Sequence, residues 1–550
     1  MAGLPFVDCN CEIGTRANRH SAEPWRLQQY KDDFEYYDIM AAVVYHAVAK
    51  DYCAEYGNKR LMREIGDDLT LIPQWVVLPH HTGEMPPPPE LVDDMLNQGV
   101  RSARIFPSHH RYNMDPYIVG PLLTELEHHR IPLFVDISEI SGIGEAAEIC
   151  QRHPTLPLVV CGVSWGIDRQ LYPALAKAPN LYIETHAHQG HRAYERFVRE
   201  FGDDRLLFGT DLPRRSPGAA RMMTDYEDIP DESRRKIAGE NIMRLLSRVE
   251  GATGRPLPDI PEPPEHPDDD PLVAQMRTGE VITDHFILDA HGHLGHPGCM
   301  GVHVALPYND ADNLVGTMNR VGIDICCFSP WMGIITGDSE ANDISLQAVN
   351  AHPDRLMAYG CNNPNYPDQH AAEMERIFES DRVIGAKPYV SRQGVPYYDP
   401  RRKPTYEWAN ENEKPVLYHG QMNREGGMSP DLVREMAPKY PKASHIVAHS
   451  GSSWKMAEGM IEACNECDNV FAEITYTSIL YGFIEYFCEN SNPNQLLFGT
   501  DCVMRDAAPQ FGWVAWARIP YEQKLRIIAA NMADILKMPE DERVNRVPEA

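Results

Sequence analysis

The chain contains 550 residues, of which 43% are hydrophobic, a length sufficient for two domains with separate cores. Its 51 basic and 80 acidic residues give a net charge of −29, which argues against a nucleic-acid partner because such binding requires a basic face. No stretch approaches the roughly 18 apolar residues of a membrane span. The 13 scattered cysteines, with no secretory leader, indicate reduced thiols, so we expect a cytoplasmic protein without a membrane partner.

The first half of the chain contains short apolar runs that end in polar or sulfur-bearing residues. The run VDCNCEIG spans 7–14, and later runs end at Asp136, Cys161 and Asp211. Short runs rich in Val, Leu, Ile and Phe, bounded by Pro, Gly or polar residues, are typical of fully buried strands in a parallel sheet. A His-x-His sequence at 186–188 follows another such run, NLYIE, and we expect it in a loop.

A proline-rich, acidic segment separates the two halves. Residues 251–271 include the tripeptide DDD and lack apolar periodicity, which is typical of a stiff linker. A short helix at 272–279 is expected to lead into the second half. The composition therefore predicts a first domain at 1–250, a linker at 251–283 and a second domain at 284–550.

The run ILDAHGHLG opens the second half and carries two histidines at alternate positions. Side chains on a strand alternate between its faces, so His291 and His293 point the same way and could hold one metal ion. Later apolar runs end in His419, His449 and Asp501. Each polar group follows the C-terminal end of an expected strand, which is where a (β/α)8 barrel carries its chemistry.

Stretches with helical character separate these runs, at 313–322, 342–352, 370–380 and 521–536. The alternation of strand and helix predicts parallel strands joined by crossover helices. Each half has the length of about 250 residues that is typical of one such barrel. The predicted fold class is therefore α/β, with two tandem (β/α)8 TIM-barrel domains.

The order His-x-His, His, His, Asp on successive strands resembles the amidohydrolase superfamily. The ending LLFGTD followed by IIAANMADIL is similar to the amidohydrolase-2 branch, which includes aminocarboxymuconate-semialdehyde decarboxylase. The resemblance covers about 284–538. It implies one divalent ion, with zinc preferred and manganese or another transition metal as alternatives. It also implies metal ligands at His291, His293, His419 and Asp501, and catalytic roles for His449 and Asp501.

These residue types suit one kind of chemistry. Neutral imidazole and carboxylate ligands favour Zn²⁺ or a similar ion, which lowers the pKa of bound water from about 15.7 to about 7. Asp501 could carry the proton of that water to a leaving group, while His449 could polarise a substrate carbonyl. We expect a metal-dependent hydrolase of a small, carboxylate-bearing substrate. The alternatives are a non-oxidative decarboxylase of an aromatic or muconate-type acid and a non-catalytic metal-binding scaffold.

Further residues after the expected strands could line the pocket. Arg392 or Arg505 could hold a substrate carboxylate through a two-pronged hydrogen-bonded pair. Lys387 could anchor the substrate or, as in some superfamily members, be carbamylated. Glu473, matched by Glu184 in the first half, could support a ligand histidine. The substrate-lining candidates are Trp331, Lys387, Tyr389, Arg392 and Arg505.

The two halves are internal repeats of one another. FGTD and IAGENIMRLL in the first half parallel FGTD and IIAANMADIL in the second. The positions equivalent to the five site residues hold no histidine in the first half, but Asn10, Glu12, Asp136, Cys161 and Asp211. We interpret this half as a degenerate barrel with a structural or regulatory role, with a hard-cation site built on its oxygen ligands as the alternative. Because relatives often pair barrel to barrel, we expect the two barrels of this chain to pair with each other. Assembly into a homo-oligomer is a further possibility.

Overall fold

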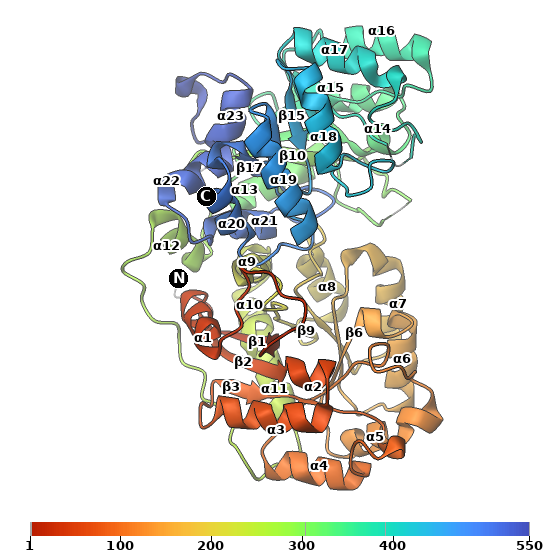
Figure 1. Cartoon of the computed structure of the whole chain (residues 1–550), viewed down its shortest axis with the longest axis vertical. Coiled ribbons are helices and arrows are strands. Elements are labelled where there is room, and N and C mark those ends of the chain that lie inside the picture. The colour runs from red at the N-terminus through yellow and green to blue at the C-terminus, as the bar shows by residue number, and fades with distance from the viewer. Residues whose placement is uncertain (1–2, 303, 391, 549–550) are drawn as a thin grey trace. The chain divides into compact units, whose positions relative to one another are not determined.

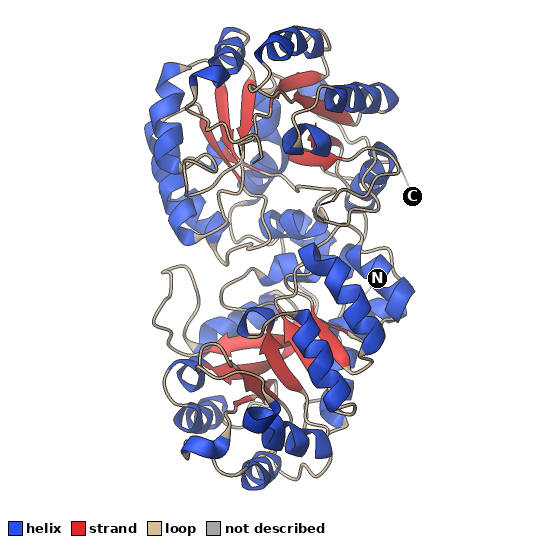
Figure 2. Ribbon diagram, turned by 90° about the vertical axis from the view of Figure 1, so that its right-hand side faces the viewer, coloured by secondary structure: helices blue, strands red, loops and turns tan. Residues whose placement is uncertain are grey.

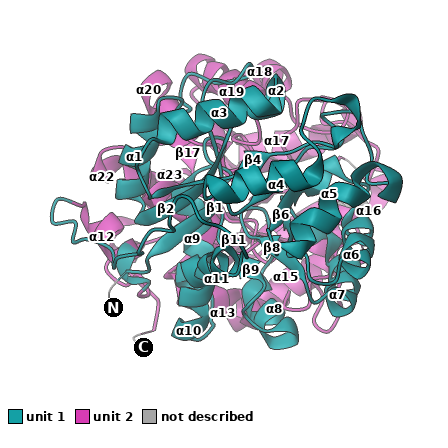
Figure 3. Cartoon of the chain, turned by 90° about the horizontal axis from the view of Figure 1, so that it is seen from below, with its two compact units in different colours: residues 1–268, 277–279 teal, residues 269–276, 280–550 magenta. Residues whose placement is uncertain are grey.

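The computed structural model describes residues 3–302, 304–390 and 392–548. The chain divides into two compact units, 1–268 with 277–279 and 269–276 with 280–550, which we call the first and second unit (Figure 3). In each unit, strands lie inside a layer of helices (Figures 1 and 2). Among the described residues, no helix combines the length and apolar character needed to cross a membrane.

The second unit is a closed barrel of parallel strands. Its sheet has eight strands in sequential order, and the backbone bond from Ala290 N to Phe498 O, 3.0 Å long, joins the last strand to the first. The strands are β10 (Leu288–Leu294), β11 (Ile325–Pro330), β12 (Leu356–Gly360), β13 (Val383–Ala386), β14 (Pro415–Tyr418), β15 (Ser444–Val447), β16 (Val470–Glu473) and β17 (Leu496–Leu497). Almost every strand residue is buried, as the continuous apolar runs predict.

Helices connect these strands and follow the last of them. Those between β10 and β14 are α13 (Ala311–Val321), α14 (Trp331–Ile335), α15 (Glu340–Ala351), α16 (Pro367–Ile377) and α17 (Lys403–Glu411). Those that follow β14 are α18 (Pro430–Met436), α19 (Trp454–Glu466), α20 (Phe483–Asn490), α21 (Ala508–Ala515), α22 (Tyr521–Leu525) and α23 (Asn531–Ile535). The predicted alternation of strand and helix is confirmed.

The first unit follows the same order with one interruption. Its strands are β1 (Phe6–Ile13), β2 (Ile39–His46), β3 (Leu71–Pro73), β4 (Trp75–Val76), β5 (Ala103–Ile105), β6 (Leu133–Asp136), β7 (Leu158–Cys161), β8 (Leu181–Glu184) and β9 (Leu206–Leu207). β3 pairs with β2 and β4 pairs with β5, so Gln74 divides the third barrel strand in two. The bond from Cys9 N to Phe208 O, 3.0 Å long, links the last strand to the first.

The helices of the first unit also alternate with its strands. They are α1 (Leu27–Tyr36), α2 (Ala47–Asp51), α3 (Ala54–Ile65), α4 (Pro88–Asn97), α5 (Pro116–His128), α6 (Ile143–Arg152), α7 (Asp168–Lys177), α8 (Ala193–Phe201), α9 (Pro217–Tyr226), α10 (Asp231–Arg235) and α11 (Asn241–Ser247). The predicted α/β class with (β/α)8 barrels is thus confirmed.

The repeated sequence near the end of each unit folds in the same way twice. A turn of π-helix, Lys236–Glu240 in the first unit and Arg526–Ala530 in the second, precedes an asparagine. Asn241 Nδ2 donates to the carbonyl oxygen of Leu206 at 3.0 Å, and Asn531 Nδ2 donates to that of Leu496 at 2.8 Å. Each bond ties the final helix to the eighth barrel strand, and the strand leads directly to FGTD.

The proline-rich segment packs along the first unit. Arg255 N donates to Gln98 O at 3.4 Å, and His266 Nε2 lies 2.8 Å from Asp38 Oδ1. The short helix expected at 272–279 is α12 (Pro271–Thr278). Asp270 caps it by accepting from the Leu272 N–H, and its other oxygen pairs with the buried Lys524 at 2.6 Å. These contacts attach residues up to 268 to the first unit and Asp270 to the second unit.

Candidate metal centre

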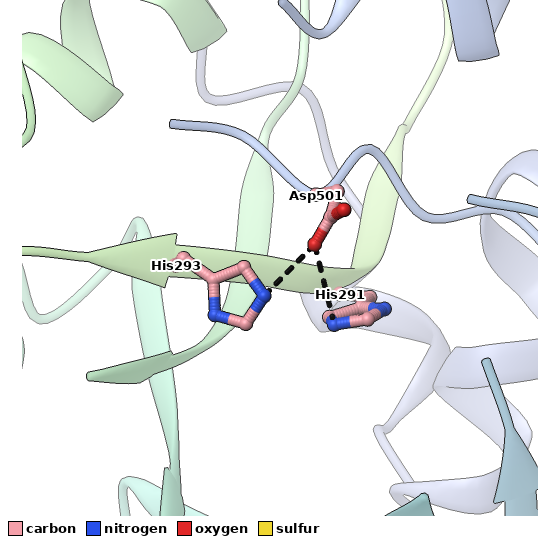
Figure 4. A group of neighbouring side chains, drawn as sticks. All are labelled: His291, His293 and Asp501. Atoms are coloured by element: carbon pink, nitrogen blue, oxygen red, sulfur yellow. Dashed lines mark ion pairs between the residues drawn. The ribbon is translucent and has the colours of Figure 1, made fainter. Parts of the chain in front are cut away.

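Three buried side chains meet at the C-terminal end of the second barrel. His291 and His293 come from β10, and Asp501 follows β17 (Figure 4). Asp501 Oδ1 lies 2.8 Å from His293 Nε2 and 3.7 Å from His291 Nε2. In the described part of the chain, this is the only group of three or more His, Cys, Asp or Glu whose ligand atoms lie within 4.8 Å of one another. We call these residues the triad.

A buried carboxyl group aligns the two chain segments that supply the triad. Asp289 accepts hydrogen bonds from the backbone N–H groups of His291, at 2.9 Å, and Thr500, at 3.0 Å, and from the Thr500 hydroxyl. Burial raises the pKa of Asp289 to about 7. The Asp501 N–H then donates to His291 O at 2.7 Å. Asp289, the first residue of the DAHGH motif, therefore fixes the position of His291 and His293 relative to Asp501.

Each imidazole near the centre is oriented through its Nδ1 atom. His291 Nδ1 lies 3.1 Å from Glu473 Oε2, His293 Nδ1 lies 3.2 Å from Ser329 O, and His449 Nδ1 lies 2.9 Å from Thr475 O. A ring whose Nδ1–H faces an acceptor presents a bare Nε2 atom on its opposite side. The three rings thus turn their Nε2 atoms away from these acceptors, and those of His291 and His293 face Asp501, which accepts a hydrogen bond from His293 Nε2 at 2.8 Å.

The charge states also fit a divalent ion. Burial, together with nearby Lys387, holds the pKa of His291 well below its usual range, so this imidazole is neutral. Burial opposes ionisation of Asp501, but Arg505, His293 and His291 outweigh it and hold the pKa of the carboxyl well below its usual range. Neutral imidazoles and a carboxylate are the donor set that suits Zn²⁺ or Mn²⁺. The triad therefore fits the ion that the sequence predicts.

A lysine ammonium group lies against the triad. Lys387 follows β13, is 1% exposed, and places its Nζ atom 3.1 Å from His291 Nε2. Burial lowers the pKa of Lys387 to about 8. A buried amine thus contacts the nitrogen lone pair that a metal ion would use.

The other two predicted histidines adjoin the triad without joining it. The ring centroid of His449 lies 5.6 Å from that of His291 and 4.8 Å from that of His419. His419, predicted as a ligand, has no ligand atom within the triad's group. Burial, with Lys387, lowers the pKa of His419 to about 4, so it also presents a neutral ring. The structure brings all four imidazoles into one continuous row.

Aromatic rings surround this row of histidines. The Trp331 ring lies 5.9 Å from that of His293, Tyr389 lies 5.2 Å from His419, and Tyr476 lies 5.4 Å from His449. Trp331, Tyr389 and Tyr476, which we call the aromatic wall, follow β11, β13 and β16. Three separate barrel loops therefore supply flat apolar surfaces around one buried polar centre.

The two predicted arginines have different surroundings. Arg505 Nε donates to Asp501 Oδ2 at 3.0 Å, and its guanidinium carbon lies 5.2 Å from the centroid of the Tyr476 ring. Arg392 is exposed in the turn after β13. Sequence reasoning missed Thr475 and Tyr476, although their position just beyond β16 could have indicated them, because residues beyond strand ends line the mouth of such a barrel.

In the first unit, arginines and a tyrosine donate hydrogen bonds to the carboxylates at the positions equivalent to His293 and Asp501. Glu12 accepts from Tyr45 at 2.7 Å and from Arg214 at 2.5 Å. Asp211 accepts from Arg214 at 3.2 Å and from Arg215 at 3.3 Å.

The remaining equivalent positions are also engaged. Asn10 accepts from Arg104 Nη1 at 2.8 Å and donates to Glu184 at 3.1 Å. Asp136 accepts from the Ser138 N–H at 2.9 Å, and burial raises the pKa of the Cys161 thiol. Arg104 thus lies beside Asn10 as Lys387 lies beside His291, and a fixed guanidinium supplies positive charge there.

The barrel and the buried triad at its C-terminal end define a metal-dependent enzyme. The family model described as amidohydrolase (Amidohydro_2) matches residues 15–248 and 330–538, more than half of the chain. The chain therefore belongs to the amidohydrolase family. The second match includes His419, His449 and Asp501 but begins after β10, so His291 and His293 lie outside it.

No curated protein sequence matches the chain. Among solved structures, 5-carboxyvanillate decarboxylase from Novosphingobium aromaticivorans, complexed with manganese and 4-hydroxy-3-methoxy-5-nitrobenzoic acid, is 14% identical, with 46% of this chain and 97% of that chain covered and a TM-score of 0.38. A 2,6-dihydroxybenzoate decarboxylase from Rhizobium is 14% identical, with coverages of 46% and 99% and a TM-score of 0.37. A dihydroxybenzoic acid decarboxylase from Polaromonas sp. JS666, with manganese and 2-nitroresorcinol, is 15% identical, with coverages of 47% and 99% and a TM-score of 0.37.

Proposed function

We propose that the second unit catalyses the metal-dependent decarboxylation of a small aromatic carboxylic acid. The observation that carries this proposal is the position of Lys387, whose ammonium group lies 3.1 Å from His291 Nε2, in the row of histidines that the aromatic wall contacts. A carboxylate bound by this buried cation would lie at the triad itself, where the reaction occurs. The sequence favoured hydrolysis, and the placement of Lys387 moves our proposal to loss of the carboxylate.

One divalent ion would be held by His291, His293 and Asp501, with His419 and His449 beside them. When bound, such an ion would act as a Lewis acid toward oxygen atoms of the substrate. We favour Zn²⁺ or Mn²⁺ because both accept imidazole and carboxylate ligands. The neutral state of His291 and the ionised state of Asp501 support this assignment.

The aromatic wall supports a planar substrate. Trp331, Tyr389 and Tyr476 come from different loops and flank the row of histidines. Aromatic pairs in offset or edge-to-face contact contribute about 0.5–1.5 kcal/mol beyond the burial of their area. A flat ring held against these side chains would lie beside the row of histidines, in which His291 contacts Lys387.

Decarboxylation requires one proton for each carbon dioxide released. As R–COO⁻ loses carbon dioxide, the electron pair of the broken C–C bond stays on the ring carbon, which must take up a proton to give R–H. We propose that this proton comes from a water molecule at the site and is relayed by Asp501 or His449, because both present acceptor atoms to the centre at which Lys387 would hold the carboxylate. Lys387 stabilises the carboxylate before the C–C bond breaks. After carbon dioxide has left, no carboxylate remains for Lys387 to bind.

Hydrolysis is the second candidate, and one observation favours it. Arg505 and the histidines hold the pKa of Asp501 well below its usual range, so its carboxylate is ionised at neutral pH. An ionised carboxylate can accept a proton from an attacking water. In that reaction the substrate would be an ester or amide that carries a separate carboxylate.

Product analysis of the metal-loaded chain separates these reactions. The protein is supplied with one equivalent of Zn²⁺ or Mn²⁺ and incubated with hydroxylated benzoic acids, muconate-type acids, and aromatic esters and amides. Release of carbon dioxide and the matching ring product supports decarboxylation. Release of an acid with an alcohol or amine, without carbon dioxide, would replace it with hydrolysis. A fully loaded protein that turns over none of these compounds would favour the scaffold alternative.

A further inference from the structure

Thr475 connects two of the imidazoles at the metal centre. It lies two residues beyond the end of β16 and is completely buried. Its Oγ1 atom is 2.7 Å from His449 Nδ1, 3.3 Å from His291 Nδ1 and 2.8 Å from Glu473 Oε2. Its backbone N–H donates to Glu473 Oε1 at 2.8 Å. One residue thus contacts both rings and the carboxyl group between them.

The direction of these hydrogen bonds follows from the proton count. A threonine hydroxyl has one proton to donate and lone pairs to accept with. If it donated to His449 Nδ1, that nitrogen would carry a lone pair directed at Thr475 O, only 2.9 Å away, and the two would repel. The hydroxyl therefore donates to Glu473, and its oxygen, with Thr475 O, accepts from the Nδ1–H of His449.

The same chain of bonds determines the state of His291. Its Nδ1 lies 3.1 Å from Glu473 Oε2, the oxygen that also receives the Thr475 hydroxyl proton. When Glu473 is ionised, that oxygen accepts a hydrogen bond from each partner, so His291 carries its proton on Nδ1 and is bare at Nε2. Both rings consequently present Nε2 as an acceptor, the form in which an imidazole binds a metal ion.

The first unit provides an internal comparison at the equivalent position. There, Glu184 ends β8 as Glu473 ends β16, and the N–H of His186 donates to Glu184 Oε1 at 2.6 Å. The side chain is a histidine, whose Nδ1 lies 2.5 Å from Glu184 Oε2. Asn10 and Cys161 replace the two imidazoles in this unit. The threonine hydroxyl is thus present in the unit with histidines to orient and absent from the other.

We propose that Thr475 is a positioning residue for the metal site, holding His291 and His449 in the Nδ1-protonated tautomer with Nε2 directed to the centre. This inference rests on the metal-dependent function proposed above. It gives Thr475 no contact with substrate and no part in proton transfer. Its effect is exerted through metal affinity, because supporting partners of metal-bound histidines typically change that affinity by about 10- to 100-fold.

The test compares Thr475→Val and Thr475→Ser in the full-length chain. Valine keeps the branched shape and removes the hydroxyl, whereas serine keeps the hydroxyl. Zn²⁺ and Mn²⁺ affinities are measured by competition with a chromophoric chelator, and melting temperatures are measured on the metal-free proteins. We expect Thr475→Val to weaken metal binding by about 10- to 100-fold and Thr475→Ser to bind close to wild type.

Thr210→Val is the matched control. Thr210 is a buried threonine of the first unit whose hydroxyl donates to the Asp8 carboxyl group, far in sequence from the triad. It should lose stability without losing metal affinity. Wild-type affinity in Thr475→Val, or equal weakening in Thr475→Ser, would overturn the role of Thr475 while leaving the metal site intact. A wild-type chain that binds neither ion would overturn the proposed function together with this inference.

Discussion

Replacing Lys387 by methionine removes the buried ammonium group beside His291 and keeps a side chain of similar length. The wild-type amine is 1% exposed and 3.1 Å from His291 Nε2. If it anchors the substrate carboxylate, Lys387→Met loses a charge-assisted hydrogen bond inside a buried site. If it is carbamylated and ligates metal, the same change removes a metal ligand.

The expected size of the effect follows from these surroundings. A hydrogen bond to a charged group contributes about 1.5–3 kcal/mol, which corresponds to roughly a 10- to 150-fold loss in kcat/KM. Metal affinity should not fall, because the variant removes a positive charge next to a ligand nitrogen and so removes repulsion of the incoming ion. The prediction is therefore a large loss of catalysis with metal binding maintained or tightened.

The assay measures kcat/KM for the best acid of the substrate panel, together with metal content by mass spectrometry of the elements. Lys455→Met, at an exposed position of α19, is the control and should change neither quantity. Unchanged kcat/KM in Lys387→Met would refute the anchoring role. Loss of metal together with activity, and a carbamate adduct on wild-type Lys387 in the intact protein mass, would show that the lysine ligates metal instead.

Further predictions concern metal content and stability. His293→Ala should abolish tight metal binding and turnover, and unchanged metal content would contradict the assignment of the triad. The wild-type chain should hold one transition-metal ion, because arginines already occupy the carboxylates of the first unit, so two ions per chain would be inconsistent with this interpretation. Asp38→Asn should lower the free energy of unfolding by about 3–5 kcal/mol, since the buried Asp38 pairs with Arg221 at 3.1 Å and Arg277 at 2.6 Å; urea unfolding at pH 7 measures this. Burial opposes ionisation of Asp38, but Arg221 and Arg277 outweigh it and lower its pKa in the folded state. The stabilisation is therefore complete above the unfolded pKa of about 3.9 and is lost as the pH falls through the folded value, so the wild type and Asp38→Asn should converge in acid. A difference that persists at low pH would refute the ion-pair explanation.

Much of the fold could be predicted because it depends on local patterns. Runs such as PVLY and LVVC are apolar on both faces, which identifies strands that are covered on both sides of a sheet. The division of the third strand of the first unit at Gln74 had no such signal, because it depends on the register of β2 and β5 on either side. The packing of residues 251–268 on the first unit was likewise missed, since proline-rich composition reports stiffness and not contacts.

The features of the candidate site also separate into those with a local sequence signal and those without one. The sequence alone determined that His291 and His293 share one face of a strand and that His419, His449 and Asp501 follow strand ends, because alternation and strand termination are local properties of the chain. Only the tertiary structure decided that Asp501 joins the two histidines of β10 while His419 stays outside the group, and that Lys387 and Thr475 contact His291. These contacts join residues 96 to 210 positions apart. Their geometry depends on how the barrel closes and how its loops pack, and short-range patterns in a sequence carry no record of either.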